Sequence, residues 1–236
     1  MVALTAWCGQ RLITLERMKL FINPKYERLQ DFILHLEENF QHGGELIHKG
    51  RNEIKVFDVD GVQLCVKHFG EPGLRGRLAR TFLRSSKAKK AFVRPLELRE
   101  RGFESPEPVA YVCYREGLTR QSTYYVCLHS HYRHSMEDIM DLPPEERDEL
   151  VKQLGVYCAR LHADGFLHRD FSPDNVLFDK IDGRYRFSLI DTNSIKTGKP
   201  VSMEQGEQNL KQLDTSQGLF GLLLAVYRDE REKLKG

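Results

Sequence analysis

The sequence predicts an α+β protein with a β-rich N-terminal half, built on a five-stranded antiparallel sheet, and a mainly helical C-terminal half. Short runs rich in β-branched and aromatic residues, separated by turn signals, occupy the first half and are typical of antiparallel strands. From Pro143 onward, apolar residues recur at helical spacing instead. The length of 236 residues suits one large domain or two closely packed lobes.

Local patterns predict the elements of the N-terminal half in order. A helix is expected over residues 24–40, where a proline suits the first turn and apolar residues follow at helical spacing. The basic segment 72–96 is expected to be partly helical, with a kink or a restart at Pro95, because proline removes a backbone donor. The five strands are expected at residues 45–49, 53–59, 62–69, 109–115 and 124–128.

The C-terminal half begins with a helix that starts at Pro143 and carries acidic residues in its first turn, where they suit the helix dipole. Two short strands are expected on either side of the Asp182-Gly183 turn, and two further helices at 203–213 and 218–227. We therefore expect three parts: an N-terminal extension at 1–23, a β-rich N-terminal lobe (N-lobe) at 24–129 and a mainly helical C-terminal lobe (C-lobe) at 130–236.

Composition excludes several classes of protein. The hydrophobic fraction of 40% and the charged fraction of 30% are those of a soluble globular chain, and they argue against disorder. The 5 cysteines are widely spaced without a CxxC pair, which indicates neither a zinc site nor a disulfide framework and fits a reducing compartment. No apolar run approaches the roughly 18–20 residues that span a bilayer. We expect a cytoplasmic protein.

The strongest chemical signal is the loop His168-Arg169-Asp170-Phe171-Ser172-Pro173-Asp174-Asn175, which follows a helix and precedes a strand. Phosphoryl transfer needs an aligned acceptor hydroxyl and metal-held charge neutralisation. Asp170 can orient the hydroxyl and take its proton, while Asn175 and Asp191 supply the oxygen ligands that Mg²⁺ prefers. The other interpretation is a turn whose Asp and Asn cap backbone groups, but four residue types would then coincide by chance.

Two features of the N-terminal half suit ATP. Lys67, on the third expected strand, can neutralise the α- and β-phosphates if it points into a cleft; otherwise it is a solvent-facing lysine. The turn Gly50-Arg51-Asn52 can lie over the phosphates and bind them through backbone N–H groups or through Arg51. The turn has one glycine instead of a GxGxxG pattern, so its signal depends on Lys67.

Together these residues resemble the protein-kinase-like superfamily and, more narrowly, the lipopolysaccharide core kinases of the Kdo and heptose kinase type. The resemblance implies a two-lobed protein-kinase-like fold and an enzyme that uses ATP and Mg²⁺ to phosphorylate a sugar hydroxyl of lipopolysaccharide core, Kdo or heptose. It also implies that Lys67, Asp170, Asn175 and Asp191 take the roles given above. The narrower similarity lies in the runs Ile22–Glu27, Gly50–Phe57, Ser86–Lys90, Ser105–Tyr111 and His168–Phe178.

The chain departs from protein kinases in ways that bear on the acceptor. Asp191 is followed by Thr192-Asn193 instead of Phe-Gly, no Ala-Pro-Glu follows, and Ser172 stands where protein kinases carry a lysine. These differences favour a sugar or glycolipid acceptor over a peptide. A second departure is Val93, at the position where the family pattern has a glutamate that pairs with the strand-three lysine.

Glu97 and Glu100 are the nearby alternatives to Val93 as a partner for Lys67. The sequence therefore leaves two other functions open. One is a pseudokinase or nucleotide-binding module, and the other is a kinase of a protein Ser/Thr or another small-molecule acceptor.

Basic residues without any acid fill the segment 75–94, which allows peripheral contact with an anionic membrane at the inner-membrane face. Each basic residue near such a surface contributes about 1 kcal/mol. A solvated helix face is the other interpretation. Nucleic-acid binding is not expected, because no aromatic residues that could stack on bases alternate with the charges.

Overall fold

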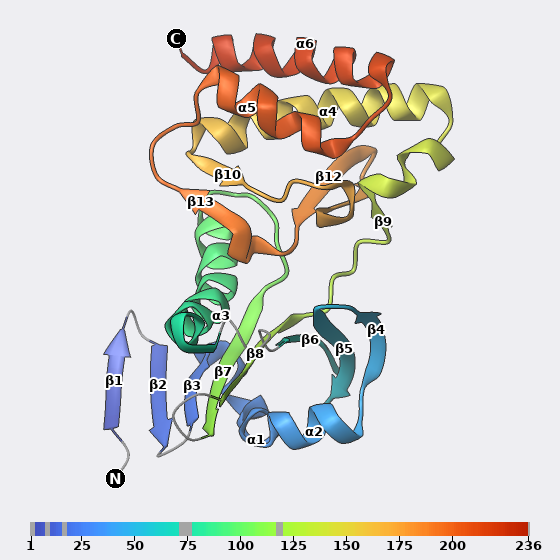
Figure 1. Cartoon of the computed structure of the whole chain (residues 1–236). Helices are drawn as coiled ribbons and strands as arrows, with labels where there is room; N and C mark the ends of the chain where they lie inside the picture. The colour runs from blue at the N-terminus through green and yellow to red at the C-terminus, as the bar shows by residue number, and fades with distance from the viewer. Residues whose placement is uncertain (1–2, 8–9, 16–17, 71–76, 117–119, 236) are drawn as a thin grey trace. The chain divides into compact units, whose positions relative to one another are not determined.

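The computed structural model describes the backbone of residues 3–7, 10–15, 18–70, 77–116 and 120–235, and the side chains of 18–70, 87–114 and 122–235. The chain forms two compact units (Figure 1). The first comprises Met1–Leu96 and Pro106–Ser130, and the second comprises Glu97–Ser105 and His131–Gly236. The segment Glu97–Ser105 thus belongs to the second unit, although the chain passes through it between two elements of the first.

The first unit is built on an eight-stranded antiparallel sheet in the order β1-β2-β3-β7-β8-β6-β5-β4 (Figure 1). All five expected strands are present, and three more, β1, β2 and β3, extend the sheet from the segment expected to be an N-terminal extension. β3 pairs with β7, which lies far along the chain, so no local sequence pattern reveals that these three strands join the sheet. The strands are β1 (Ala3–Trp7), β2 (Gln10–Leu15), β3 (Met18–Ile22), β4 (Glu45–Lys49), β5 (Asn52–Val59), β6 (Val62–Phe69), β7 (Pro108–Glu116) and β8 (Arg120–Leu128).

Short helices cover one face of this sheet. The single helix expected at 24–40 is divided into η1 (Pro24–Leu29), α1 (Gln30–Leu34) and α2 (Leu36–His42), because His35 between α1 and α2 leaves the helical conformation. Buried apolar side chains from these helices pack on Leu64 and Val66 of β6. Their contacts fix β6 from one side.

Helix α3 (Arg77–Glu100) covers the other face of β6. The restart expected at Pro95 does not occur, since the helix continues through this residue. Ala88, Ala91 and Phe92 are buried against the sheet, and Pro95 is buried as well. Burial of this helix face offsets the cost of a proline inside a helix, about 3 kcal/mol.

The second unit contains three main helices, a three-stranded sheet and a two-stranded ladder (Figure 1). The hairpin of β11 and β12 turns at Asp182 and Gly183, whose φ angles of 50° and 75° are those that a tight hairpin turn requires. The helices are α4 (Pro144–Ala163), α5 (Met203–Leu210) and α6 (Gln217–Lys233); the strands are β9 (His134–Ser135), β10 (Phe166–His168), β11 (Val176–Ile181), β12 (Arg184–Leu189) and β13 (Ile195–Thr197); the 3₁₀ turns are η3 (Met136–Asp141), η4 (Pro173–Asn175), η5 (Thr192–Ser194) and η6 (Lys211–Leu213).

Close packing of α4 on α6 forms the centre of this unit. A Cβ atom at Gly155 of α4 would lie 3.0 Å from the Val226 side chain, tighter than ordinary contact, so glycine suits the close approach of the two helices. Buried leucines of α4, among them Leu150 and Leu154, share one apolar cluster with Leu223 of α6 and with the hairpin. Among the residues that the structure describes, no helix has both the length and the apolar character needed to cross a bilayer.

Candidate active site

The loop from His168 to Asn175 is held by its own side chains. It leaves β10 at His168, exposes the Asp170 carboxylate and enters η4 at Pro173, where a proline fits the first helical turn. Asn175 is buried, and its Nδ2 donates to the Asp170 carbonyl (3.0 Å) and to Ser172 Oγ (2.9 Å). Both hydrogen bonds use the amide nitrogen, so Oδ1 is the atom of Asn175 available to a cation.

Asp191 follows the β12 strand in an unusual backbone conformation. Its φ of 50° and ψ of 40° lie in the left-handed region, which costs a non-glycine residue on the order of 1 kcal/mol and recurs at functional sites. The side-chain amide of Asn193 bonds to the residues on either side of Thr192–Asn193. Its nitrogen donates to Asp191 Oδ1 (2.6 Å), and its oxygen accepts from the Ser194 N–H (3.1 Å). The Asp191 carboxylate is therefore held in a defined direction.

Backbone hydrogen bonds join these two segments into one unit. The Ile190 N–H donates to the Asn175 carbonyl (3.1 Å), and His168 Nε2 donates to the Ile190 carbonyl (2.9 Å). Ser194 Oγ lies 3.2 Å from His168 Nδ1 and 3.1 Å from the carbonyl oxygen of Asp191. Burial lowers the pKa of His168, so its ring is neutral and acts as a brace between the loop and the strand end.

This unit fits the needs of Mg²⁺. Asn175 Oδ1 and the Asp191 carboxylate are hard oxygen ligands, carried by backbone segments that are hydrogen-bonded to each other. In the described part of the chain, no group of three or more His, Cys, Asp or Glu residues could hold a metal ion alone. Mg²⁺ typically completes its coordination with phosphate oxygens and water, so a site with two protein ligands is compatible with this ion.

The predicted phosphate-binding residues lie in the first unit. Lys67 is on β6, directly opposite Ile54 on one side and Tyr125 on the other. Alternation along the strand puts it on the same face as Cys65 and Phe69, and its Nζ is 5.6 Å from the centre of the Phe69 ring. Val93 of α3 is partly buried in the apolar cluster on this face, so no carboxylate occupies that position.

Gly50, Arg51 and Asn52 form the tip of the β4–β5 hairpin. The Gly50 N–H donates to the Asn52 carbonyl (3.1 Å), and both Gly50 and Arg51 are exposed. Gly70, just after β6, packs against the Arg51 carbonyl so closely that a Cβ atom would be 1.8 Å from its oxygen. The turn is thus fixed beside the end of the strand that carries Lys67.

The profile of the lipopolysaccharide kinase (Kdo/WaaP) family matches residues 50–228, about three quarters of the chain. The chain belongs to this family. It is therefore a kinase, as the sequence indicated, and its membership confirms the predicted likeness to the lipopolysaccharide kinases.

Comparison with solved structures bears on the fold, and the WaaP match shows it. WaaP, in a structure titled as a complex with acyl carrier protein, has a TM-score of 0.61 and 19% identity, with 92% of each chain covered. A WbdD structure has a TM-score of 0.47 and 20% identity over 77% of this chain and 43% of its own. The PknI kinase domain of Mycobacterium tuberculosis has a TM-score of 0.43 and 16% identity over 72% and 67%. No curated protein matches the sequence. The WaaP match, with the largest TM-score of the three, confirms the predicted kinase-like fold.

Sequence reasoning missed one unusual thiol of this kinase. Cys65, half-buried and two residues before Lys67, has its pKa lowered to about 6, chiefly by the neighbouring Cys127 and His129 side chains. The sequence indicated only that the cysteines form neither a zinc site nor a disulfide framework, because the cross-strand neighbour of Cys65, Cys127, comes from a distant strand. The one signal that could have singled out Cys65 is its position two residues before Lys67, which places both side chains on the same face of β6.

Two polar residues that hold the kinase loop were missed as well. Asn209 Nδ2 donates to the His168 carbonyl (2.8 Å), and Gln212 Oε1 accepts from the Phe171 N–H (3.0 Å). Both residues lie in the segment 203–213, for which the sequence predicted only a helix. Their contacts lie about forty residues away along the chain, beyond the reach of local patterns.

Proposed function

We propose that the protein transfers the γ-phosphoryl group of ATP, with Mg²⁺, to a sugar hydroxyl of lipopolysaccharide core, either Kdo or heptose. The observation that carries this proposal is the hydrogen-bonded unit that presents Asp170, Asn175 and Asp191 together in a member of a lipopolysaccharide kinase family. Phosphoryl transfer needs positioning and charge neutralisation more than covalent chemistry, and these three residues supply both.

Each residue has a distinct task in this proposal. The exposed Asp170 carboxylate orients the acceptor hydroxyl and takes its proton as the oxygen attacks phosphorus. Asn175 Oδ1 and the Asp191 carboxylate would hold Mg²⁺, which would neutralise phosphate charge when bound. Lys67 binds the α- and β-phosphates, and the turn Gly50–Asn52 lies over them, binding them through its backbone or through the exposed Arg51.

The loop also supports a sugar acceptor. Ser172 Oγ accepts a hydrogen bond from Asn175 and so helps to orient the proposed metal ligand. The position therefore lacks the positively charged lysine that protein kinases carry there. We assign ATP binding to the N-lobe, residues 24–129, and catalysis to the C-lobe, residues 130–236.

Helix α3 supports a peripheral membrane location at the cytoplasmic face of the inner membrane. Lys87, Lys89 and Lys90 are exposed while Ala88 and Ala91 are buried, so this part of α3 presents a basic outer face. Such a face attracts anionic lipid headgroups and phosphorylated core sugars alike. The remaining side chains of the segment 75–94, at positions 75–86, lie outside the described residues.

A second candidate function is nucleotide binding without turnover. Val93 favours it, because an apolar side chain stands where the family resemblance places the glutamate partner of Lys67. The two candidates differ in one measurable respect, since only the first forms a phosphate ester.

The deciding experiment incubates the purified protein with ATP, Mg²⁺ and isolated core glycolipid and compares Asp170→Ala, Asp191→Ala and Asp174→Ala. Asp174 is an exposed carboxylate in the same loop and serves as the matched control. Removing a general base costs on the order of 10²- to 10⁴-fold, so Asp170→Ala should abolish most transfer, whereas Asp174→Ala should retain it.

Two outcomes oppose the proposal. Nucleotide binding without any sugar ester in the wild type supports the second candidate, and faster transfer to a peptide than to sugar overturns the acceptor assignment.

A further inference from the structure

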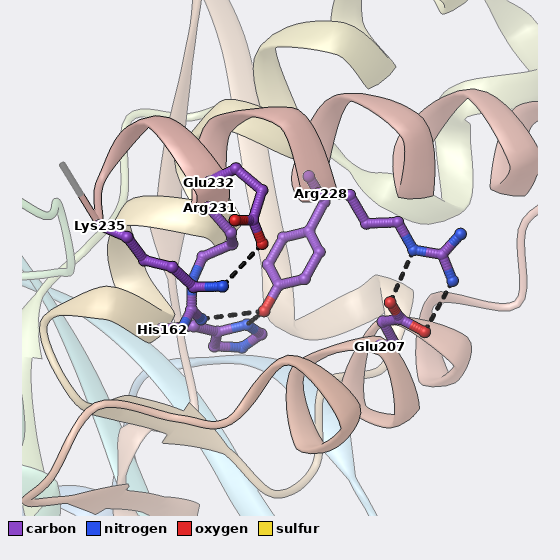
Figure 2. Close-up of polar contacts among 7 residues, drawn as sticks. His162, Glu207, Arg228, Arg231, Glu232 and Lys235 are labelled. Atoms are coloured by element: carbon purple, nitrogen blue, oxygen red, sulfur yellow. Dashed lines mark hydrogen bonds and ion pairs between the residues drawn. The ribbon is translucent and has the colours of Figure 1, made fainter.

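Four polar side chains form a hydrogen-bonded chain from α6 to the backbone of the catalytic loop. Arg231 Nη1 lies 3.1 Å from Tyr227 Oη, which lies 3.0 Å from His162 Nδ1. His162 Nε2 lies 3.1 Å from Asn209 Oδ1, and Asn209 Nδ2 lies 2.8 Å from the His168 carbonyl oxygen. In Figure 2, dashed lines join Arg231 and His162 to the same hydroxyl, that of Tyr227, beside the ion pairs of Arg228 with Glu207 and of Lys235 with Glu232. We call Arg231, Tyr227, His162 and Asn209 the α6 relay.

Only one arrangement of hydrogens satisfies every contact of the α6 relay. The His168 carbonyl can only accept, so Asn209 turns its amide nitrogen to it and its oxygen to His162. His162 Nε2 must then carry the proton, which leaves Nδ1 as an acceptor for the Tyr227 hydroxyl. Arg231 can only donate, and it donates to that hydroxyl oxygen. Each bond therefore points the same way, from α6 toward the loop.

Burial makes this arrangement stable. His162 and Tyr227 are fully buried, while Asn209 and Arg231 are exposed by only 4% and 7%. Burial lowers the pKa of His162 to about 4, so the ring is neutral near pH 7 and keeps the tautomer that the relay requires. Because water cannot replace a buried partner, a break at one link leaves the next polar group unsatisfied.

The helices are packed in a way that leaves space for the α6 relay. A Cβ atom at Gly206 of α5 would lie 1.8 Å from Tyr227 Oη and 2.9 Å from His162 Nδ1, so a glycine is needed there. Arg231 Nη2 also donates to the Val201 carbonyl (2.7 Å), which ties the segment before α5 to α6. Three helices thus meet at the relay, and its far end is the carbonyl two residues before Asp170.

We infer that the residues of the α6 relay are positioning residues for phosphoryl transfer: they orient the catalytic loop at His168 and make α6 part of the catalytic machinery. Arg231 lies beyond the family match, which ends at Arg228, so the resemblance assigns it no role. The predicted effect of the α6 relay on the rate of phosphoryl transfer rests on the proposed function. Its predicted effect on the conformation of the catalytic loop does not.

Tyr227→Phe tests the inference, with Tyr185→Phe as its matched control. Tyr185 is a buried tyrosine of the same unit whose hydroxyl donates to Glu146 (3.1 Å) outside the relay. Hydrogen–deuterium exchange of residues 166–175 and the kinetics of phosphoryl transfer are measured on both full-length variants. Tyr227→Phe should speed exchange in this segment and lower kcat about tenfold with the KM for ATP unchanged, the equivalent of one buried hydrogen bond. Tyr185→Phe should change neither.

Asn209→Asp tests the direction of the relay. This replacement keeps the shape of the side chain but removes the donor that faces the His168 carbonyl. It should raise exchange in residues 166–175 at least as much as Tyr227→Phe, and Asn209→Gln, which keeps an amide donor, should recover part of the loss.

The exchange data and the kinetics separate two failures. If exchange in residues 166–175 is the same in the wild type, Tyr227→Phe and Asn209→Asp, the α6 relay does not hold the loop and the inference is wrong. If exchange responds as expected but the wild type phosphorylates no sugar, the relay stands and the proposed function fails. If kcat falls equally in Tyr185→Phe, the effect is general loss of packing, which also overturns the inference.

Discussion

Lowering the pH from 7 to 5 should destabilise the second unit through His162. Its pKa is lowered from the ordinary 6.5 to about 4, chiefly by burial and also by the charge of Arg231. Between these two values the unfolded chain binds a proton that the folded chain does not, so stability is present above pH 6.5 and is lost as the pH falls toward 4. Protonation would also place a second donor against the Tyr227 hydroxyl and break the α6 relay.

The magnitude follows from the pKa difference. A change of one pKa unit corresponds to 1.36 kcal/mol, so the full window is worth about 3 kcal/mol, of which about 2 kcal/mol is lost between pH 7 and pH 5. Urea unfolding followed by circular dichroism at both pH values measures this loss. His162→Gln keeps a donor and an acceptor without a titrating ring, so its stability should depend on pH less by about the same amount.

The matched control is His131→Gln, which removes an exposed histidine of the same unit. It should lose as much stability at pH 5 as the wild type does. If His162→Gln and the wild type lose equal stability between pH 7 and 5, His162 is not a buried neutral histidine and the reasoning is refuted.

Three shorter predictions concern other parts of the molecule. Iodoacetamide at pH 7 should modify Cys65 before the buried cysteines, because its lowered pKa leaves it largely as thiolate; peptide mass spectrometry that finds a buried cysteine labelled first would contradict this. Ser172→Ala removes the acceptor that orients Asn175, so the Mg²⁺ concentration for half-maximal activity should rise roughly tenfold, and an unchanged requirement would count against a metal role for Asn175. Gly206→Ala should cost about 1–3 kcal/mol in thermal unfolding, since its Cβ meets the Tyr227 hydroxyl; a variant as stable as the wild type would show that this contact is not tight.

Local sequence patterns predicted most strands and helices of the fold, because their signals are turns and apolar spacing within a few residues. The Asp182-Gly183 hairpin and the helix after Pro143 are both present where expected. Patterns failed where structure depends on distant partners. Strand β3 is defined by its pairing with β7, and α3 passes through Pro95 because the sheet and the core bury that face.

The candidate site likewise has a part that local sequence patterns predicted and a part that they did not. The loop at His168–Asn175 is visible in the sequence because one short segment contains all its residue types. Its support is not visible, since the partners of His162 lie 47 and 65 residues away. A histidine at the end of an apolar helical stripe was the only available signal that a buried partner was required.

Product analysis of one reaction tests the proposed activity most directly. The wild type is incubated with ATP, Mg²⁺ and core glycolipid, and ³¹P NMR and mass spectrometry examine the glycolipid. We predict one new phosphomonoester on a Kdo or heptose hydroxyl for each ADP formed, and none with Asp170→Ala. ADP with free phosphate and no sugar ester, or full ester formation by Asp170→Ala, would contradict the assignment of this loop as the phosphoryl-transfer site.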